Sequence, residues 1–557
     1  MITKTHKVLK WLVCVALFTI HYSLFTSCSE KWDDHYETAT MEGGTLWQTI
    51  ASPQNNTTQF ARVLQACGYE EVLNGSQSYT VFAPTDAQLS AREADSLIAL
   101  FNTEKDSGRR TNDNKVVRQF IQNHIALYKY PVSSLTNDTI TLMNDKYYVI
   151  NGKTIVNPST DQIVNLSTCQ LVSNGLFYTI DRKLDYFPNI FEYLGLDSET
   201  DSVYQFFNSY NIYEFNEAKS VVGDIVDGQT IYLDSVSDLN NRLFNQYGLI
   251  NSEDSTYWML CPTNTEWTRL VEEYSPYFNY PNNVAKRDSL VYTNTRLAVV
   301  GGGFFSGTTN SETALQDSAV STMAQSALVR SLLDIEPYYV YTKPFAAGGI
   351  FDGTEDILCS NGHVMKSSSF GISKYQTFMQ TIKVEAENLQ YQDSIVDAID
   401  PVTIHQVTTN NPFYGKVSGN SFVEVKPSTP TASVVIRYSI PNLLAATKYD
   451  VFAVFVPSTA ADTLSVEESK KAYRIVSRVA QTDQNGKLSE PPLRNAKNTK
   501  AEVIDTVKLS TVNISTCSYG LSDALVKLDL KSNVQESQLS NYSNTLRLDC
   551  FIFKPVE

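Results

Sequence analysis

Glu385 and Glu387 are two acidic residues whose spacing allows them to act together, in the segment Lys383-Val384-Glu385-Ala386-Glu387-Asn388. In a β-strand, residues i and i+2 point to the same face, so both carboxylates could bind one hard cation. The alternative is a pair of glutamates at a strand edge that face solvent. A strand has to position them in either case, and its neighbours in the sheet decide which interpretation holds.

The sequence contains none of the short motifs that mark common classes of catalytic or nucleotide-binding site. No HExxH, GxSxG, Walker or GxGxxG pattern occurs. The cysteines of the body of the chain stand singly, and Cys517 with Cys550 is the one pair that we consider for a disulfide. Paired carboxylates for glycoside hydrolysis can lie anywhere in a sequence, so a glycan-active enzyme stays open as an alternative. Beyond the first 27 residues the histidines lie far apart, at His35, His124, His363 and His405.

Cys28 offers a different chemistry, the acylation of a thiol. Three lysines precede an apolar run over residues 11–20, and Thr26-Ser27 stands directly before Cys28. A basic start, a short apolar core and a small residue at the cleavage position make up a secretory signal. The apolar run is too short to span a bilayer comfortably. The alternative is an ordinary signal peptide with a cysteine nearby.

The residues before Cys28 resemble the lipobox of bacterial lipoproteins, although Phe25 stands where leucine is usual. The resemblance implies a signal peptide over 1–27 and a lipid on Cys28, which anchors the chain in a membrane. The acidic stretch within 28–41 resembles the tether of lipoproteins that some Gram-negative anaerobes display on the outer membrane. A solvated linker without such meaning is the alternative. We therefore expect a lipid-anchored, surface-exposed protein of the outer membrane.

The composition narrows the class of partner. A chain of 557 residues should hold three or four domains. The formal net charge of −16 becomes −19 when the three lysines of the first 27 residues are removed. This acidic balance disfavours nucleic acid and anionic lipid surfaces as partners. With 11% aromatic residues, the chain holds enough apolar side chains for packed cores, so we exclude a largely disordered protein.

One pattern occurs twice along the chain. Residues 79–89 are typical of a buried strand that ends at a proline and leads into a helix, and residues 257–267 repeat this 178 positions later. Proline ends the strand, and the following Thr with Asp or Asn offers side-chain oxygens to free amides at a helix start. The residues with these roles are Pro84, Thr85 and Asp86 in the first copy, and Pro262, Thr263 and Asn264 in the second.

A second marker follows in each copy, an Asn-Gly turn that leads into a strand. It stands at Asn174-Gly175, whose strand ends at Asp181, and again at Asn361-Gly362. The helical segments before the first marker are offset by 144 residues and the later markers by 178, so the second copy carries 34 extra residues. We place this insertion near 220–250.

These motifs resemble the fasciclin (FAS1) family. Residues 79–86 are similar to its first conserved box, Asn174 to Asp181 to its second, and 116–124 to the helix that ends at a family histidine, here His124. The first copy, 42–186, matches all three. The second, 187–376, has no histidine at the corresponding positions. The resemblance implies a β-wedge of two short sheets flanked by helices, in a family associated with adhesion and with matrix or glycan contact.

Strand signals dominate the last third, 382–557. Apolar and β-branched runs alternate with proline and polar turns, which is typical of an antiparallel β-sandwich, jelly-roll-like in its order. The fold class expected for the whole chain is α+β: two tandem fasciclin-like domains and then an all-β sandwich. The predicted strands of the sandwich cover 433–440, 448–456, 474–479, 503–510 and 546–555.

The start of this sandwich resembles the opening strand of jelly-roll carbohydrate-binding modules. In that family two glutamates at this spacing hold a structural calcium, which the resemblance assigns here to Glu385 and Glu387; we expect no other cofactor. All five tryptophans lie at or before Trp267. The sandwich would therefore contact a sugar through residues such as Phe413 and Tyr414. A place in the core or at its rim is the alternative for both rings.

Two hypotheses follow. The first is a non-enzymatic surface lipoprotein for adhesion or ligand binding, with an extracellular protein or glycan as partner. The second is a glycan-binding accessory subunit of a starch-utilisation-type uptake system, associated with an outer-membrane transporter. Reproducible turnover of a polysaccharide would favour the enzyme alternative over both.

Overall fold

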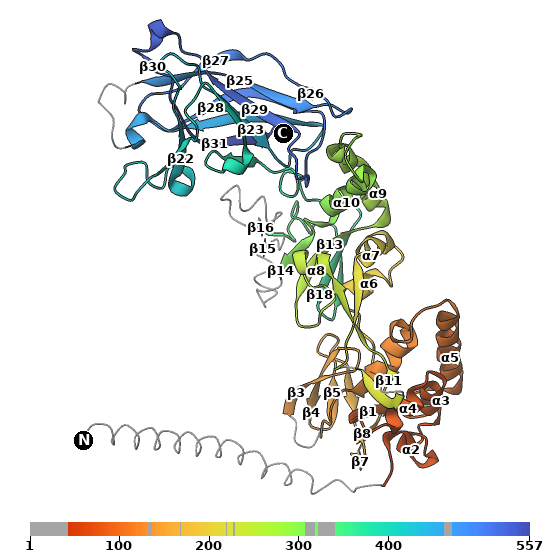
Figure 1. Ribbon diagram of the computed structural model, residues 1–557. Coiled ribbons are helices and arrows are strands. Elements are labelled where there is room, and N and C mark those ends of the chain that lie inside the picture. The colour runs from red at the N-terminus through yellow and green to blue at the C-terminus, as the bar shows by residue number, and fades with distance from the viewer. Residues whose placement is uncertain are drawn as a thin grey trace, which may run out of the picture. The chain divides into compact units, whose positions relative to one another are not determined.

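The computed structural model describes residues 43–131, 136–167, 169–218, 220–226, 229–306, 318–320, 340–461 and 471–557. The signal segment, the acidic stretch with Cys28 and the positions 335–339 lie outside these residues. The chain forms two compact units, one of Met1–Pro188 with Ile212–Asn240 and the other of Asn189–Asn211 with Asn241–Glu557 (Figure 1). No helix among the described residues is long and apolar enough to cross a membrane.

Helices begin the first unit. They are α2 (Leu46–Ile50), α3 (Thr58–Ala66), α4 (Tyr69–Asn74) and, after the first strand, α5 (Ala91–Asp106). Helix α3 is amphipathic: Phe60, Val63 and Leu64 recur at helical spacing and are fully buried. These helices therefore cover one face of the sheet that follows.

The central sheet of the first unit has the order β2-β1-β8-β7. Strand β1 (Tyr79–Pro84) runs parallel to β8 (Gly175–Ile180), and β2 (Ile125–Ala126) and β7 (Gln170–Val172) pair with them in antiparallel fashion. Every residue of β1 is buried because the sheet is covered on both faces. Val81 packs in the core beneath the helices, whereas Phe82 packs in the core on the other side.

The second sheet of this unit covers that other face. It contains β3 (Thr136–Thr141), β4 (Tyr147–Asn151), β5 (Thr154–Val156) and β6 (Ile163–Asn165), paired in sequence order. Tyr148, Ile150, Ile155 and Val164 from these strands share a core with Phe82. Two small sheets flanked by helices are the arrangement that the sequence predicts for a fasciclin-like domain.

The second unit begins with a domain of the same topology. Its sheet has the order β14-β13-β18-β17, with β13 (Tyr257–Pro262) parallel to β18 (Gly362–Ser367) and with β14 (Phe304–Ser306) and β17 (Glu355–Cys359) at the edges. Tyr257 pairs with Gly362 here as Tyr79 pairs with Gly175 in the first unit. The helices are α6 (Ile190–Leu194), α7 (Asp201–Asn208), α8 (Arg242–Tyr247), α9 (Asn264–Tyr274) and α10 (Arg287–Val300).

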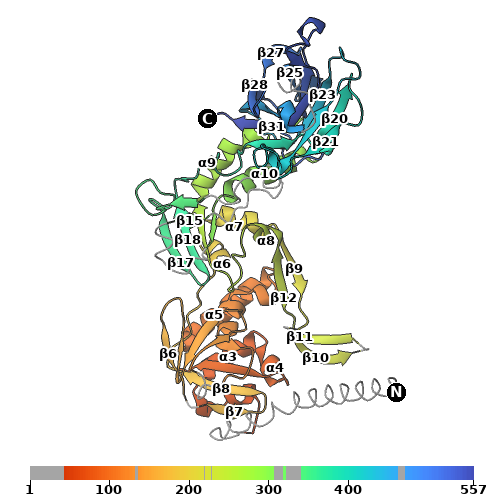
Figure 2. The ribbon, with the colours of Figure 1, turned by 90° about the vertical axis from the view of Figure 1, so that its left-hand side faces the viewer.

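Extra strands separate α7 from α8, whereas only a short turn separates α3 from α4. Strands β9 (Asn211–Phe215) and β12 (Ser237–Asn241) pair with each other, and β10 (Val221–Val226) pairs with β11 (Gln229–Asp234) (Figure 2). The extra segment therefore begins before the predicted position of 220. The two marker offsets give the length of the insertion, but they do not fix the residue at which it begins.

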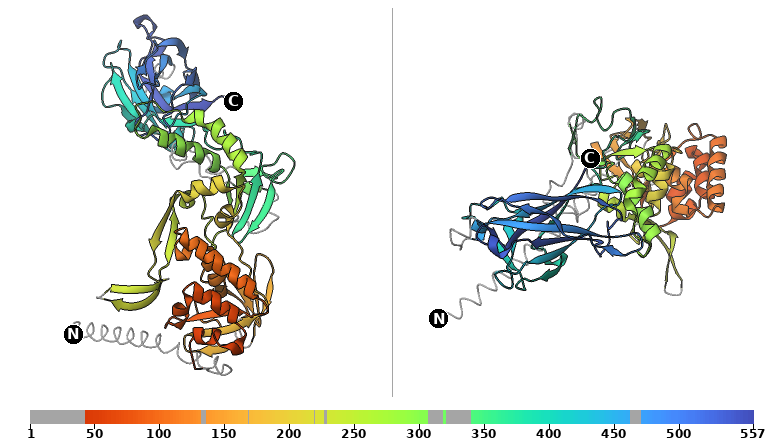
Figure 3. Two further views of the ribbon diagram at one scale, coloured as in Figure 1. Left: turned by 90° about the vertical axis from the view of Figure 1, so that its right-hand side faces the viewer. Right: turned by 90° about the horizontal axis from the view of Figure 1, so that it is seen from above.

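The C-terminal region is an all-β sandwich of two sheets (Figure 3). One has the order β21-β22-β31-β24-β28, with β19 beside β31, and the other has the order β20-β23-β29-β25-β26, with β27 and β30 beside β25. The all-β prediction is confirmed. The first sheet consists of β19 (Ile382–Glu385), β21 (Thr403–Gln406), β22 (Ser421–Val425), β24 (Thr447–Phe455), β28 (Asp505–Ile514) and β31 (Leu546–Pro555). The second consists of β20 (Gln392–Val396), β23 (Val435–Ile440), β25 (Ala472–Thr482), β26 (Leu488–Ser489), β27 (Arg494–Asn498), β29 (Val526–Ser532) and β30 (Tyr542–Ser543).

The proposed disulfide between Cys517 and Cys550 is wrong. Both cysteines are buried and free; the other cysteines of the described residues are free as well, and all of them except the partly exposed Cys169 are buried. Cys517 follows β28 and donates its backbone N–H to the carbonyl of Asn279, whereas Cys550 lies inside β31 and pairs with Glu385. The two thiols serve as small apolar side chains in different parts of the core.

Candidate functional site

Asn174, the first residue of the Asn-Gly marker, ties three segments together. Its Oδ1 accepts the N–H of Leu46 at 2.7 Å, at the start of α2. Its Nδ2 donates to the carbonyls of Leu73 at 2.8 Å and Gly75 at 2.7 Å, at the end of α4. Orphan amides and carbonyls at helix ends need such partners when they are buried.

Asn361 repeats this role in the second unit. Its Oδ1 accepts the N–H of Ile190 at 2.9 Å, and its Nδ2 donates to the carbonyls of Ile250 at 2.8 Å and Ser252 at 2.9 Å. Both asparagines are almost fully buried. Their polar atoms are engaged within the fold, so this marker holds the helices to the sheet and offers nothing to a ligand.

Asp86 and Asn264 form the second shared contact. Asp86 Oδ1 accepts the N–H of Gln59 at 2.8 Å and Asn264 Oδ1 accepts the N–H of Ser202 at 2.9 Å, in each case at the start of the helix that precedes the strand. The side chain caps α3 or α7, not the following helix that the sequence suggested. The reason is tertiary: the turn after the strand lies against the beginning of an earlier helix, where free amides point outward.

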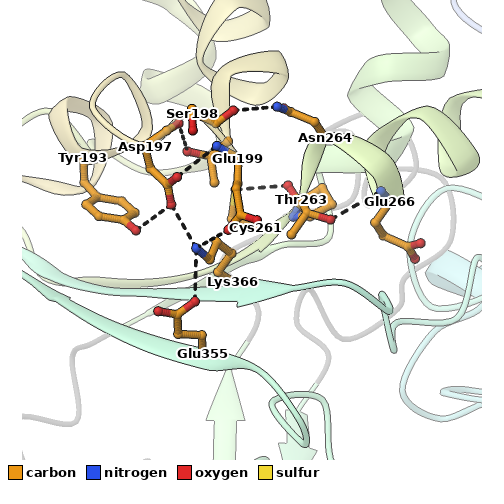
Figure 4. Close-up of polar contacts among 12 residues, drawn as sticks. Tyr193, Asp197, Ser198, Glu199, Cys261, Thr263, Asn264, Glu266, Glu355 and Lys366 are labelled. Carbon is orange, nitrogen blue, oxygen red and sulfur yellow. Dashed lines mark hydrogen bonds and ion pairs between the residues drawn. The ribbon is translucent and has the colours of Figure 1, made fainter.

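The two copies differ in how the following helix starts. In the second unit Thr263 Oγ1 accepts the N–H of Glu266 at 3.4 Å and caps α9 (Figure 4). In the first unit Ser90 caps α5, and the carbonyl of Thr85 accepts N–H groups of the turn instead. Pro84 and Pro262 are the last residues of β1 and β13.

His124 is fully buried at the end of a short helical turn, Gln122–His124. Its Nε2 accepts the N–H of Leu184 at 3.0 Å, so Nδ1 carries the proton and donates to the carbonyl of Phe120 at 2.7 Å. Burial lowers the pKa of His124 to about 4, which keeps the ring neutral. Its two nitrogens are engaged by backbone, so His124 is positioned to hold loops rather than to move protons. Asp181 likewise accepts both the backbone and the side chain of Asn165.

Lys366 is a charged centre that sequence analysis missed. Its Nζ lies 3.0 Å from Asp197, 2.7 Å from Glu199 and 3.0 Å from Glu355, and its side chain is 10% exposed (Figure 4). Hydrogen bonding to Glu199 and its neighbours raises the pKa of Lys366, so the ammonium stays charged. The group is satisfied by its own carboxylates, which fits a structural ion-pair network. No spacing along the sequence connects these residues.

Glu385 and Glu387 of the sandwich lie close to a third acidic residue, Asp549. Glu385 ends β19 and Glu387 follows two residues later; both are half-buried, while the alternating residues Val384 and Ala386 face the core. Strand β31 runs beside β19 and brings in Asp549, which is 3% exposed. Ligand atoms of Glu385, Asp549 and Cys550 lie within 4.8 Å of one another. Asp549 has no sequence signal, because strand pairing alone places it there.

The charges of this carboxylate cluster, Glu385, Glu387 and Asp549, are only partly balanced. Lys383 Nζ lies 2.8 Å from Glu385 Oε1, and Ser418 Oγ donates to the same oxygen at 2.6 Å. Burial raises the pKa of Asp549 to about 7, even though the backbone N–H of Ser418 donates to this carboxylate, and burial also raises the pKa of Glu387. Three carboxylates beside one ammonium leave room for a divalent cation.

The cluster also has free ligand atoms. Glu385 Oε2 and Glu387 Oε2 are both buried and have no hydrogen-bond partner among the described residues. Buried acceptors without a partner are rare and unfavourable, and calcium prefers carboxylate oxygens. Burial raises the pKa of the Cys550 thiol, so its sulfur stays protonated when no cation is bound. Glu385 and Asp549, whose ligand atoms lie within 4.8 Å of each other, are the residues that would hold a calcium ion here, and the unpartnered Oε2 of Glu387 is a further candidate ligand.

The loop with Phe413 and Tyr414 presents one ring to solvent. Tyr414 is 47% exposed, whereas Phe413 packs against a small core that includes Val417 and Phe422. Asn411 Oδ1 accepts the N–H of Phe413 at 3.0 Å and fixes the turn. Of the two predicted contact residues, only Tyr414 has a ring free to stack on a ligand.

Comparisons with known proteins define the first domain. Residues 55–185 match the model of the Fasciclin domain, so this part of the chain is a fasciclin domain, as the motifs predict. No curated protein matches the chain. A FAS1 domain pair from the insect cell adhesion molecule Fasciclin I is similar, with 9% identity over 58% of this chain and 100% of that one and a TM-score of 0.19.

Two further solved structures are similar to a part of this chain. A family 35 carbohydrate-binding module from Clostridium thermocellum has 10% identity over 31% of this chain and 97% of its own, with a TM-score of 0.18. A xanthan lyase from Paenibacillus has 15% identity over 31% of this chain, with a TM-score of 0.20. This chain spans 13% of the length of that lyase.

Proposed function

We propose that this protein is a non-enzymatic, lipid-anchored protein of the outer-membrane surface, which binds an extracellular protein or glycan through its fasciclin-like domains. The observation that carries the proposal is the fasciclin domain at 55–185, whose motif residues serve the scaffold. Rigid scaffolds of this kind present their loops for recognition. Binding, rather than turnover, is the activity that such an arrangement supports.

The anchor is tested at Cys28. Each methylene of an acyl chain adds about 0.8 kcal/mol of membrane affinity, so the wild-type protein should partition into the detergent phase and be cleaved by protease added to intact cells. Cys28→Ala should appear in the aqueous fraction. Cys14→Ala, a change at the other cysteine of the leader, should behave as wild type. Membrane attachment that survives Cys28→Ala would refute lipid anchoring at this residue.

A second candidate function is that of a glycan-binding accessory subunit of a starch-utilisation-type uptake system. The carboxylate cluster favours it, because the sequence around Glu385 and Glu387 resembles the calcium-binding opening strand of carbohydrate-binding modules. We expect affinity-tagged protein from its native host to co-purify with an outer-membrane transporter, and to do so more strongly when glycan is present. Recovery of the protein without a transporter under both conditions would remove this candidate.

A further inference from the structure

An open groove of about 920 Å³ lies within the second unit, between the helices α9 and α10 and the sandwich. Both helices lie next to the sandwich in all views (Figures 1, 2 and 3). Val271 and Val291 line the helical side, whereas Ala446 and Ile514 line the sandwich side. The volume is within the range of about 300–1,000 Å³ that is typical of small-molecule sites.

Hydrogen bonds fix the two walls of this groove to each other. The segment between α9 and α10 exchanges backbone hydrogen bonds with the sandwich, and the hydroxyl of Tyr280 donates to the carbonyl of Tyr519 at 2.8 Å. A groove held in this way is preformed, so a ligand does not have to order it on binding. The backbone pairs are Ala445 N to Tyr277 O at 2.9 Å, Cys517 N to Asn279 O at 2.8 Å and Asn282 N to Gln484 O at 2.9 Å.

The guanidinium of Arg296 is stacked on one face of the Tyr292 ring in the groove. Tyr292 lies in the N-terminal half of α10 and is 50% exposed, whereas the buried residues of this helix begin at Thr295. The guanidinium of Arg296 lies 3.6 Å from the centroid of the Tyr292 ring and donates to the Tyr292 carbonyl at 3.1 Å. Arg296 forms no ion pair with a carboxylate of the described residues. Its remaining N–H groups are available to a ligand.

The rim carries equal numbers of opposite charges. Arg296 contributes donors, while Glu272 and Asp288 contribute acceptors; Arg287 already donates to Asp288, to Asn279 and to the carbonyl of Tyr280. Asp288 has a side chain that is 95% exposed, so its second oxygen can accept a further hydrogen bond. A phosphorylated ligand would meet both carboxylates, and a purely apolar ligand would bury the arginine donors without partners.

We propose that this groove binds a short oligosaccharide. A sugar ring has an apolar face that packs on an aromatic ring, and its hydroxyls both donate and accept hydrogen bonds. Tyr292 supplies the ring, Arg296 the donors, and Glu272 and Asp288 the acceptors. The inference rests on the proposed binding function and names its ligand class and site. Uncharged and acidic sugars share this chemistry, and the choice of probes separates them.

The test uses the full mature chain, residues 28–557, with alanine in place of Cys28. Maltohexaose, cellohexaose and a galacturonic acid hexamer are titrated by calorimetry. We expect at least one probe to bind, and Tyr292→Ala and Arg296→Ala each to weaken it by about tenfold or more, as aromatic and arginine anchors do at binding sites. Tyr128→Ala, which removes an exposed ring of the first unit, is the control and should leave the affinity unchanged, whereas Tyr414→Ala tests the competing loop of the sandwich. Melting temperatures check that each variant is folded.

Four results would contradict the proposal that this groove binds a sugar. One is that none of the probes binds, and another is that a probe binds both groove variants as tightly as the unchanged chain. The third is a loss confined to Tyr414→Ala, which assigns the glycan to the sandwich loop and leaves the proposed function standing. Capture of a protein partner by the chain and by Tyr292→Ala alike, with no sugar bound, would also reject the groove while preserving binding as the function.

Discussion

Replacing Gly362 by alanine is expected to unfold the second fasciclin-like domain. A Cβ at this position would lie 1.9 Å from the carbonyl oxygen of Tyr257, on the neighbouring strand β13, and Gly362 has φ +135°. Neither the backbone of a central parallel strand nor the substituted residue can move away cheaply. We expect a loss of at least about 4 kcal/mol in the free energy of unfolding of this domain, at the upper end for single substitutions.

Gly371→Ala is the matched control, because the nearest atom to its Cβ, the carbonyl oxygen of Ile350, is 4.0 Å away. Hydrogen exchange measured by mass spectrometry reports each domain separately, so β13 and β18 should lose protection in Gly362→Ala while β1 and β8 keep theirs. Gly175→Ala should reverse this pattern, since its Cβ would lie 2.3 Å from the carbonyl of Tyr79. Wild-type protection of β13 in Gly362→Ala would contradict the packing described here.

At the Asn-Gly markers, local structure could be predicted from the sequence, but the contacts with distant segments could not. Their position before an apolar run correctly predicts a turn followed by a strand, β8 or β18. The sequence could not reveal that this strand lies parallel to β1 or β13, because nothing local encodes a pairing between distant segments. The glycine is required by that pairing, and the asparagine by helix ends such as Leu46, 128 residues away. The roles of both residues are thus tertiary.

The carboxylate cluster could likewise be predicted from the sequence only in part. The alternation of a strand places Glu385 and Glu387 on one face, which sequence analysis could predict. The third acid, Asp549, enters through the register of β19 with β31, and the ion pairs of Lys366 join strand β18 to the loop with Asp197 and Glu199, which is distant in the sequence. The exposure of Tyr292 in the groove could not be predicted from the sequence either, since an aromatic residue on a helix is usually buried.

Calcium is expected to reverse an unusual pH dependence of the sandwich. The pKa of Asp549 is about 7 in the folded chain, against 3.8 for the unfolded one. Between these values the folded state holds a proton that the unfolded state releases, so stability is greatest at low pH and is lost as the pH rises through about 7. Without divalent cations, we expect the sandwich to lose about 3 kcal/mol of stability between pH 5 and pH 8.

A bound cation requires ionised carboxylates, so calcium should stabilise the sandwich at pH 8 and have little effect at pH 5. With calcium in about hundredfold excess over its dissociation constant, the gain is about 2.7 kcal/mol, which raises the melting temperature by roughly 5–10 °C. Calorimetry of the full mature chain at both pH values measures it. Asp549→Asn should abolish both the pH dependence and the calcium response, whereas Glu502→Gln, at an exposed acid of the same domain, should preserve them. An Asp549→Asn variant that calcium still stabilises as much as the unchanged chain would exclude Asp549 as a ligand.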